Sequence, residues 1–261
     1  MNRLILFLVA AVTTLSVAAQ PQIVAHRGFH QEGGAPCNSI EALQRAQEAG
    51  FEWVEIDVNL STDGVPMAIH GMWHPNKKEG VHVQRATKAE IQSYPLTNGE
   101  KVPTFEDILL QVKKCKSTGV VLDIKSHNTP ELDKEIVTKV VALIKKHKLQ
   151  NQMIYLVSHE YMMHLLKKLN KRADNIILAN SSYSPAWRAS VGSRIVGFPY
   201  FIWFKKGEYI ADCTRLGLKT IAWTPNDEES IRKCVEMGFH LITTDRPDLL
   251  RKVINEVYKR H

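Results

Sequence analysis

The chain has 261 residues, of which 44% are hydrophobic, and this length lies within the range of one α/β barrel domain. Its formal net charge of +7 favours acidic partners, but no basic tract is interleaved with aromatic residues, so we expect no nucleic-acid partner. Four cysteines without a Cys-x-x-Cys pair indicate neither a disulfide framework nor a thiolate zinc site.

The first 19 residues have the pattern of a secretory signal peptide. Arg3 precedes an apolar run from residue 4 to about residue 17, and the small residues Val17 and Ala19 fit a cleavage site. We expect cleavage after Ala19, export to the periplasm or the medium, and no stable membrane insertion of the mature domain at 20–261. The alternatives are an uncleaved anchor helix and a buried first helix. Cleavage removes one charged side chain, Arg3, and lowers the formal charge from +7 to +6.

Short β-branched runs alternate with amphipathic stretches along the rest of the chain, which is typical of βα units around a parallel sheet. The eight expected strands are residues 22–25, 53–58, 66–69, 120–124, 153–157, 175–179, 219–223 and 241–243. The seven expected helices are residues 39–49, 104–115, 131–147, 159–170, 207–216, 227–237 and 247–258. This alternation predicts a single-domain (β/α)8 TIM barrel.

Two segments do not fit a simple count of eight units. Residues 195–204 are either an extra strand or an aromatic-rich loop over the site, and residues 71–99 are expected to form a loop excursion with one short helix. Helix caps are expected at Asn38 with Glu41 and at Thr104 with Asp107.

Carboxylates cluster at two of the expected strands. Glu55 and Asp57 are two residues apart, so their side chains point to the same face of a strand, and Asp123 lies on another strand. Polar groups at the carboxyl ends of barrel strands form the active site in this fold. Three carboxylates there make an oxygen-only site for one divalent cation, Ca²⁺ or Mg²⁺.

Cationic and titratable groups follow other strands. Arg27 and Lys125 supply positive charge that could hold a phosphate group and stabilise its transition state. His26 and His70 are suited to act as general base and general acid. Together with a metal ion, these groups indicate phosphodiester cleavage.

Other residues near the expected strand ends have alternative interpretations. His74 or His82 could replace His70 as the second imidazole. Trp223 either stacks on a substrate or belongs to the core. Thr244 and Asp245 are interpreted as structural residues that cap the last helix.

Six motifs occur in one order along the chain: AHRGFHQEGGAPCNSIEAL, EAGFEWVEIDVNLSTDGVPMAIH, VPTFEDIL, LDIK, AWTPND and TTDRPD. With them the chain resembles the glycerophosphodiester phosphodiesterase family over nearly the whole mature sequence. The resemblance implies a TIM barrel, a divalent ion held by the acids of two strands, and acid–base catalysis by His26 and His70. It also implies hydrolysis of a glycerophosphodiester to glycerol 3-phosphate and an alcohol, through water or the substrate's own neighbouring hydroxyl.

The chain departs from the family pattern at three positions. Cys37 stands where the family has Glu, Gly71 stands where it has Asp, and Asp123 replaces a Glu. An Asp followed two residues later by Lys, as at Asp123 and Lys125, is similar to the sphingomyelinase D-like phospholipases. These departures bear on the substrate more than on the fold.

The sequence therefore predicts an exported metal-dependent phosphodiesterase that acts on a small glycerophosphodiester. One alternative is a phospholipase D-like enzyme acting on lysophospholipid or sphingomyelin head groups, with an apolar rim. The candidates for this rim are Trp73, Tyr200, Phe201, Trp203 and Phe204. Another alternative is a barrel that binds a phosphorylated ligand without turnover. A zinc amidohydrolase is disfavoured because its first strand needs a His-x-His pair, whereas Arg27-Gly28 follows His26 here.

Overall fold

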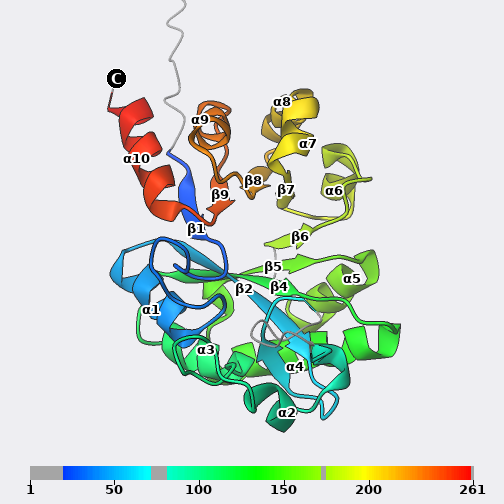
Figure 1. Cartoon of the computed structure of the whole chain (residues 1–261). Helices are drawn as coiled ribbons and strands as arrows, with labels where there is room; N and C mark the ends of the chain where they lie inside the picture. The colour runs from blue at the N-terminus through cyan, green and yellow to red at the C-terminus, as the bar shows by residue number, and fades with distance from the viewer. Residues whose placement is uncertain (1–19, 72–80, 172–174, 260–261) are drawn as a thin grey trace, which may run out of the picture.

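The computed structural model describes residues 20–71, 81–171 and 175–259, and the expected signal peptide at 1–19 lies outside them. Eight parallel strands form the barrel, in the order β6-β5-β4-β2-β1-β9-β8-β7 (Figure 1). Their bounds are β1 Gln22–Ala25, β2 Trp53–Leu60, β4 Gly119–Ile124, β5 Met153–Val157, β6 Ile176–Leu178, β7 Ile195–Pro199, β8 Lys219–Trp223 and β9 Leu241–Thr244. The prediction of a single-domain TIM barrel is confirmed.

The assignment of the third barrel strand was wrong. The strand β3 (Pro66–Ala68) is not part of the parallel barrel but pairs antiparallel with β2, whereas β7 is parallel to β8. Only a short turn separates β2 from β3, and Val65 donates its N–H to Ser61 Oγ at 2.9 Å to close it. A connection this short allows a hairpin, while a parallel strand needs a crossover of about a dozen residues.

Helices cover the outside of the barrel (Figure 1). Their bounds are α1 Ile40–Glu48, α2 Lys88–Gln92, α3 Phe105–Val112, α4 Pro130–His147, α5 Glu160–Leu169, α6 Pro185–Ser190, α7 Tyr200–Lys205, α8 Glu208–Arg215, α9 Glu228–Glu236 and α10 Pro247–Tyr258, with short 3-10 helices η1 Val83–Arg85 and η2 Gln150–Gln152. All seven expected helices are present, and α2 is the short helix expected in the excursion. Among the described residues, no helix combines the length and the apolar content needed to cross a membrane.

The N-cap of the first helix lies one residue later than predicted. Ser39, not Asn38, is the N-cap of α1, and its side chain accepts a hydrogen bond from the N–H of Ala42. Asn38 instead has a left-handed backbone with φ 57° and is buried. Asparagine tolerates this conformation better than most residues. The side chain of Asn38 is thereby free to point into the barrel end, where it contacts Asp57.

Strand residues alternate between two apolar layers. On β2, Val54 and Ile56 belong to the large core between the strands and the helices, while Trp53 packs against the apolar cluster that fills the barrel interior. This interior cluster consists of Val24, Val121, Ile154, Ile177, Ile195, Ile221 and Leu241. Glu55 and Asp57 alternate with the outward-facing residues of β2, so they lie on the interior side, above this apolar floor.

The barrel closes at the joint between β6 and β7, which are the two ends of the hydrogen-bonded strand order and lie next to each other. Within the described strands, no ladder joins them. Arg188 of α6 is fully buried at this joint, where its guanidinium donates to the carbonyls of Leu178, Asn180 and Tyr183. The guanidinium also lies 4.4 Å from the centre of the Phe198 ring on β7. The Ser193 hydroxyl, which contacts the carbonyls of Ile176 and Ile195 at 2.8 Å each, also links the two edges, so side chains take the place of a ladder here.

Candidate active site

The three predicted metal-binding acids meet at the carboxyl end of the barrel. Glu55 and Asp57 lie on β2 and Asp123 lies on β4, and the parallel register places Asp57 directly beside Asp123. One oxygen from each of the three carboxylates lies within 4.8 Å of the other two. Glu55 and Asp57 are buried, and Asp123 is half-buried. The structure therefore brings together residues that are up to 68 positions apart in the sequence.

Lys125 supplies the nearest positive charge to this acid cluster. Its Nζ lies 2.6 Å from Asp57 Oδ1 and also forms an ion pair with Asp123. Burial alone would lower the pKa of Lys125, but the charges of Asp123 and Asp57 raise it above its usual range. Lys125 is therefore charged at neutral pH and neutralises part of the cluster.

Burial and mutual repulsion act against the charged forms of two of the three acids, Glu55 and Asp123. Burial and the neighbouring charges of Asp57 and Asp123 raise the pKa of Glu55 well above its usual value. Burial also raises the pKa of Asp123, whereas at Asp57 the effect of burial is outweighed by Lys125, so the pKa of Asp57 is lowered. A buried carboxylate cluster with this repulsion is suited to an additional cation.

His26 follows β1 and is held by a partner on the adjacent last strand. Its Nδ1 lies 2.6 Å from Asp245 Oδ1, and its Nε2 lies 3.8 Å from Glu55 Oε2. The parallel pairing of β1 with β9 places Ala25 opposite Thr244, so His26 and Asp245 are neighbours at the two strand ends. A neutral His26 that donates Nδ1–H to Asp245 has its Nε2 lone pair directed toward the acids.

Asp245 is a site residue that the sequence analysis misinterpreted as a helix cap. Its Oδ1 contacts both His26 and His30, and its Oδ2 accepts a hydrogen bond from Asn226 at 2.5 Å. Arg246 occupies the cap position of α10, without a side-chain cap bond. Although burial opposes the effect, hydrogen bonds from His26 and His30 hold the pKa of Asp245 well below its usual range. Asp245 is therefore a carboxylate at neutral pH, and it favours the protonated imidazole of His30.

Arg27 approaches the acid cluster with both its backbone and its side chain. Its N–H donates to Glu55 Oε2 at 3.0 Å, and its Nε lies 3.3 Å from Asp57 Oδ2. Gly28 follows with φ 87°, and a Cβ there would lie only 2.6 Å from the Cβ of Ala42. This close approach requires glycine. The half-exposed guanidinium of Arg27 thus lies at the edge of the site.

Asn38 connects the first helix to the acid cluster. Its Nδ2 donates to Asp57 Oδ2 at 2.9 Å, and its Oδ1 accepts the backbone N–H of Asp57 at 3.0 Å. The interpretation of Asn38 as a cap was therefore wrong, because the side chain positions a site carboxylate. In the sequence, Asn38 lies two residues before the first residue of α1 and directly after Cys37, and neither position specifies this contact.

His70 follows the hairpin strand β3 at the rim of the site. Ile69 donates its N–H to the carbonyl of Asp57, and Asn59 Nδ2 donates to the carbonyls of Ile69 and Gly71. Partial burial lowers the pKa of His70, as do the charges of Arg27 and Lys125, against an opposing effect of Asp57. His74 lies outside the described residues, and His82 precedes η1.

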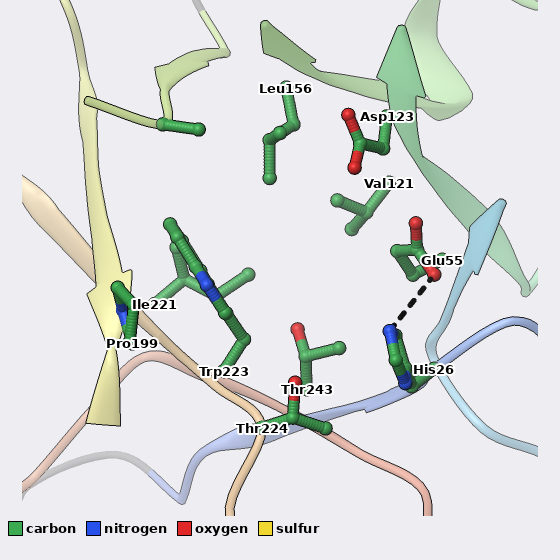
Figure 2. A pocket seen from close by; sticks show the side chains of 11 residues that line it. His26, Glu55, Val121, Asp123, Leu156, Pro199, Ile221, Trp223, Thr224 and Thr243 are labelled. Carbon is green, nitrogen blue, oxygen red and sulfur yellow. Dashed lines mark ion pairs between the residues drawn. The ribbon is translucent and has the colours of Figure 1, made fainter. Parts of the chain in front are cut away.

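A cavity of about 180 Å³ lies beside the acids. Trp223, at the end of β8, lies across this cavity from Glu55 and Asp123 (Figure 2). The Trp223 ring packs over Gly197, where an added Cβ would lie 2.4 Å from it. Between these two sides the lining is largely apolar and includes Val121, Leu156, Ala179, Pro199 and Ile221. The cavity therefore has one charged wall and one apolar wall.

The proposed aromatic rim is present only in part. Trp203 is fully buried and donates Nε1–H to the carbonyl of Ile221 at 3.1 Å, so its prediction as a rim residue was wrong. Phe201 is 50% exposed on α7, directly after the strand that ends at the cavity. Phe204 packs against the core, and Trp73 lies outside the described residues.

The fold and the site define a TIM-barrel protein with its polar centre at the carboxyl ends of the strands, which is the location of the active site in barrel enzymes. The family model described as glycerophosphoryl diester phosphodiesterase family matches residues 26–249. The chain belongs to this family.

Individual relatives agree with this assignment. The chain is 24% identical over 242 residues to a glycerophosphodiester phosphodiesterase of Caldanaerobacter subterraneus subsp. tengcongensis, covering 90% of this chain and 98% of the relative. A crystal structure of a glycerophosphodiester phosphodiesterase from Parabacteroides distasonis superposes with a TM-score of 0.85 at 29% identity, covering 92% of this chain and 98% of that chain. An Oleispira antarctica phosphodiesterase in complex with the product sn-glycerol-3-phosphate has the same fold, with a TM-score of 0.79 at 23% identity and coverage of 90% and 97%.

Proposed function

We propose that this protein hydrolyses glycerophosphodiesters to glycerol 3-phosphate and an alcohol. The observation that supports this most strongly is the convergence of Glu55, Asp57 and Asp123 beside the His26–Asp245 pair, in a chain of this family. Relatives named glycerophosphodiester phosphodiesterases, and the product complex of the O. antarctica enzyme, support the same substrate class.

One divalent cation, Ca²⁺ or Mg²⁺, is part of this proposal. The three carboxylates supply only oxygen ligands, which suit a hard cation, and a bound cation would relieve the repulsion that raises the pKa of Glu55. Glu55, Asp57 and Asp123 would hold the ion. When bound, it would offset negative charge on the phosphodiester oxygens.

His26 is the proposed general base. Asp245 holds its Nδ1, which leaves Nε2 to accept the proton of the attacking hydroxyl or water, and the carboxylate stabilises the imidazolium that forms. Arg27 and Lys125, both within reach of the acid cluster, would hold the phosphate oxygens. Trp223 would cover the alcohol or glycerol part of the substrate from the opposite wall.

His70 is the proposed general acid for the leaving alkoxide. Its position at the rim allows contact with solvent and with an alcohol group that leaves the cavity. Because its pKa is lowered in the free protein, its proton is readily given up. The negative charge of a bound phosphodiester would favour the protonated form before transfer.

A lysophospholipid head group is the second candidate substrate. It is supported by the exposed ring of Phe201, which lies two residues after Pro199 of the cavity wall. The burial of Trp203 removes the largest of the described rim candidates, so the deacylated diester is the preferred substrate. We also propose that the mature chain is exported, on the basis of the signal-peptide pattern at residues 1–19.

The test is the release of glycerol 3-phosphate from glycerophosphocholine, with lysophosphatidylcholine as the acylated comparison. EDTA should abolish release, and added Ca²⁺ or Mg²⁺ should restore it. The His26→Ala variant should lose turnover. The control variant Glu236→Gln, which changes an exposed residue of α9, should match the wild type. Turnover that persists in EDTA would disprove the metal role. Equal ligand affinity in wild type and His26→Ala, with no turnover in either, would indicate a binding protein instead.

A further inference from the structure

A second group of reactive side chains lies beside the catalytic centre, in the loop between β1 and α1. The Sγ atom of Cys37 lies 3.4 Å from Nδ1 of His30, and Nε2 of His30 lies 2.9 Å from Asp245 Oδ1. The three residues form a thiol, an imidazole and a carboxylate in series. This order of groups is the one that activates cysteine nucleophiles in enzymes.

The loop backbone fixes this arrangement. His30 donates its N–H to the carbonyl of Gly28 at 2.9 Å, and Ala35 donates its N–H to the carbonyl of His30 at 3.1 Å. Cys37 is half-buried, so the residue is held in the loop and is still partly exposed to solvent.

His30 is charged at neutral pH in this environment. Burial alone would lower the pKa of His30, but its hydrogen bonds to Asp245 and Cys37 raise it to about 9. A protonated imidazole donates Nε2–H to the carboxylate and Nδ1–H to the sulfur, so the Cys37 sulfur lies against a proton donor that can supply a leaving group.

We propose that Cys37 is a modification site, a thiol activated by His30 and Asp245 that reacts with hydroperoxides and other small electrophiles. The thiolate sulfur attacks one peroxide oxygen, an S–O bond forms, and the O–O bond breaks. Sulfur is oxidised by two electrons to a sulfenic acid, and the leaving oxygen takes the proton from Nδ1 of His30 to form water or an alcohol. Two equivalents of a small thiol reverse the step, giving the Cys37 thiol, a disulfide of the small thiol and water.

Asp245 links the Cys37 site to the proposed catalytic histidine, His26. The Sγ atom and Nδ1 of His30 are only 3.4 Å apart, so an oxygen added to Sγ would change the hydrogen bonding of an imidazole that Asp245 also holds. Asp245 is also the partner of His26. Oxidation of Cys37 is therefore expected to lower turnover without contact with the substrate.

The other cysteines provide internal controls. Cys115 is also half-buried, but its sulfur contacts the hydroxyls of Ser117 and Thr118 rather than an imidazole, and these hydrogen bonds lower its pKa. Cys213 and Cys234 are buried, and burial raises the pKa of each thiol to about 12. Labelling of these two buried thiols reports unfolding.

The first experiment measures the alkylation rate of each cysteine by iodoacetamide, by peptide mass spectrometry on the full-length folded protein. The His30→Gln variant should lower the rate at Cys37 by about tenfold relative to the wild type and leave Cys115 unchanged. An unchanged rate at Cys37 in His30→Gln would overturn the proposal. If this variant labels Cys213 and so is unfolded, Asp245→Asn provides the same test.

The second experiment links modification to turnover. Hydrogen peroxide should convert Cys37 to a sulfenic acid that dimedone traps, with loss of most activity and recovery on addition of dithiothreitol. The Cys37→Ser variant should keep its own untreated activity under the same treatment, whereas Cys115→Ser should be inactivated like the wild type. Rapid oxidation of Cys37 with no loss of turnover would overturn its connection to His26. The mass measurement does not depend on turnover, so it stands even if the proposed phosphodiesterase activity is not found.

Discussion

Asp245 accepts a hydrogen bond from Nδ1 of His26 across the boundary where the last strand of the barrel lies beside the first, with 2.6 Å between the two atoms. The two residues are 219 positions apart in the sequence, and the strand register makes them neighbours. This contact sets the orientation of the imidazole and the nitrogen that faces the acid cluster.

Asp245→Asn should impair turnover far more than substrate binding. An amide at this position cannot stabilise the imidazolium and favours the other imidazole tautomer, so we expect kcat to fall by roughly 10²- to 10⁴-fold with a small change in KM. Steady-state kinetics on glycerophosphocholine measure this. Asp248→Asn, in the exposed first turn of α10, is the matched control and should behave like the wild type. A similar loss in both variants would contradict the role of Asp245.

Asp123→Asn should weaken cation binding. Loss of one of three carboxylates is expected to reduce Ca²⁺ or Mg²⁺ affinity at least about tenfold. A cation present at about a hundred times its Kd should stabilise the wild type by about 2.7 kcal/mol, and this gain should fall to about 1.4 kcal/mol or less in the variant at the same concentration. Thermal unfolding with and without cation measures both. Glu236→Gln should keep the full gain, and a full gain in Asp123→Asn would exclude Asp123 as a ligand.

Asn38→Gly should destabilise the fold even though glycine accepts the left-handed backbone. The substitution removes both hydrogen bonds to Asp57 and leaves buried polar groups unpaired, so we expect a loss of about 1–3 kcal/mol in the free energy of unfolding. Lys148→Gly is the matched control, because Lys148 is exposed and has φ 59°. The control should be neutral or slightly stabilising in denaturant titrations. Equal behaviour of the two variants would show that the side chain of Asn38 contributes nothing.

Stability should fall as the pH is lowered below about 6.5, partly because of His127. This buried histidine accepts the backbone N–H of Leu60 at 3.1 Å, so it is held neutral, and burial lowers its pKa against an opposing effect of Asp133. With a lowered pKa in the folded state, the unfolded chain takes up the proton first. Stability is therefore fully present above pH 6.5 and decreases through the window below it.

The measurement is denaturant unfolding between pH 7 and pH 5. His127 should contribute a slope of up to about 1.4 kcal/mol per pH unit within the window. The slope should be shallower in His127→Gln, and unchanged in His164→Gln, which alters an exposed histidine on α5. An identical pH dependence in all three proteins would rule out this contribution of His127.

The sequence was sufficient for the fold because the signals for it are local. The periodicity of β-branched and amphipathic stretches predicted the TIM barrel and all seven expected helices. It could not distinguish β3 from β7, because both are short apolar runs. The distinction depends on pairing partners: a hairpin with β2 in one case and a parallel neighbour in the other.

The sequence predicted the acidic residues of the site, but not the residues that position the site side chains. The two-residue spacing of Glu55 and Asp57 showed that they share a face, and the strand-end rule placed Asp123 near them. Asp245 and Asn38 have the same local sequence features as ordinary helix caps. Their contacts with His26 and Asp57 depend on the closure of the barrel, which joins distant parts of the chain and leaves no pattern in a single sequence.

The joint held by Arg188 also borders the cavity. Ala179, directly after β6, and Pro199, at the end of β7, both line its wall, and within the described strands no backbone ladder crosses between them. Elsewhere in the barrel, widening the lumen would break rows of interstrand hydrogen bonds. At this joint the hydrogen bonds come from the side chains of Arg188 and Ser193, so this side of the barrel wall can widen without the loss of a backbone ladder.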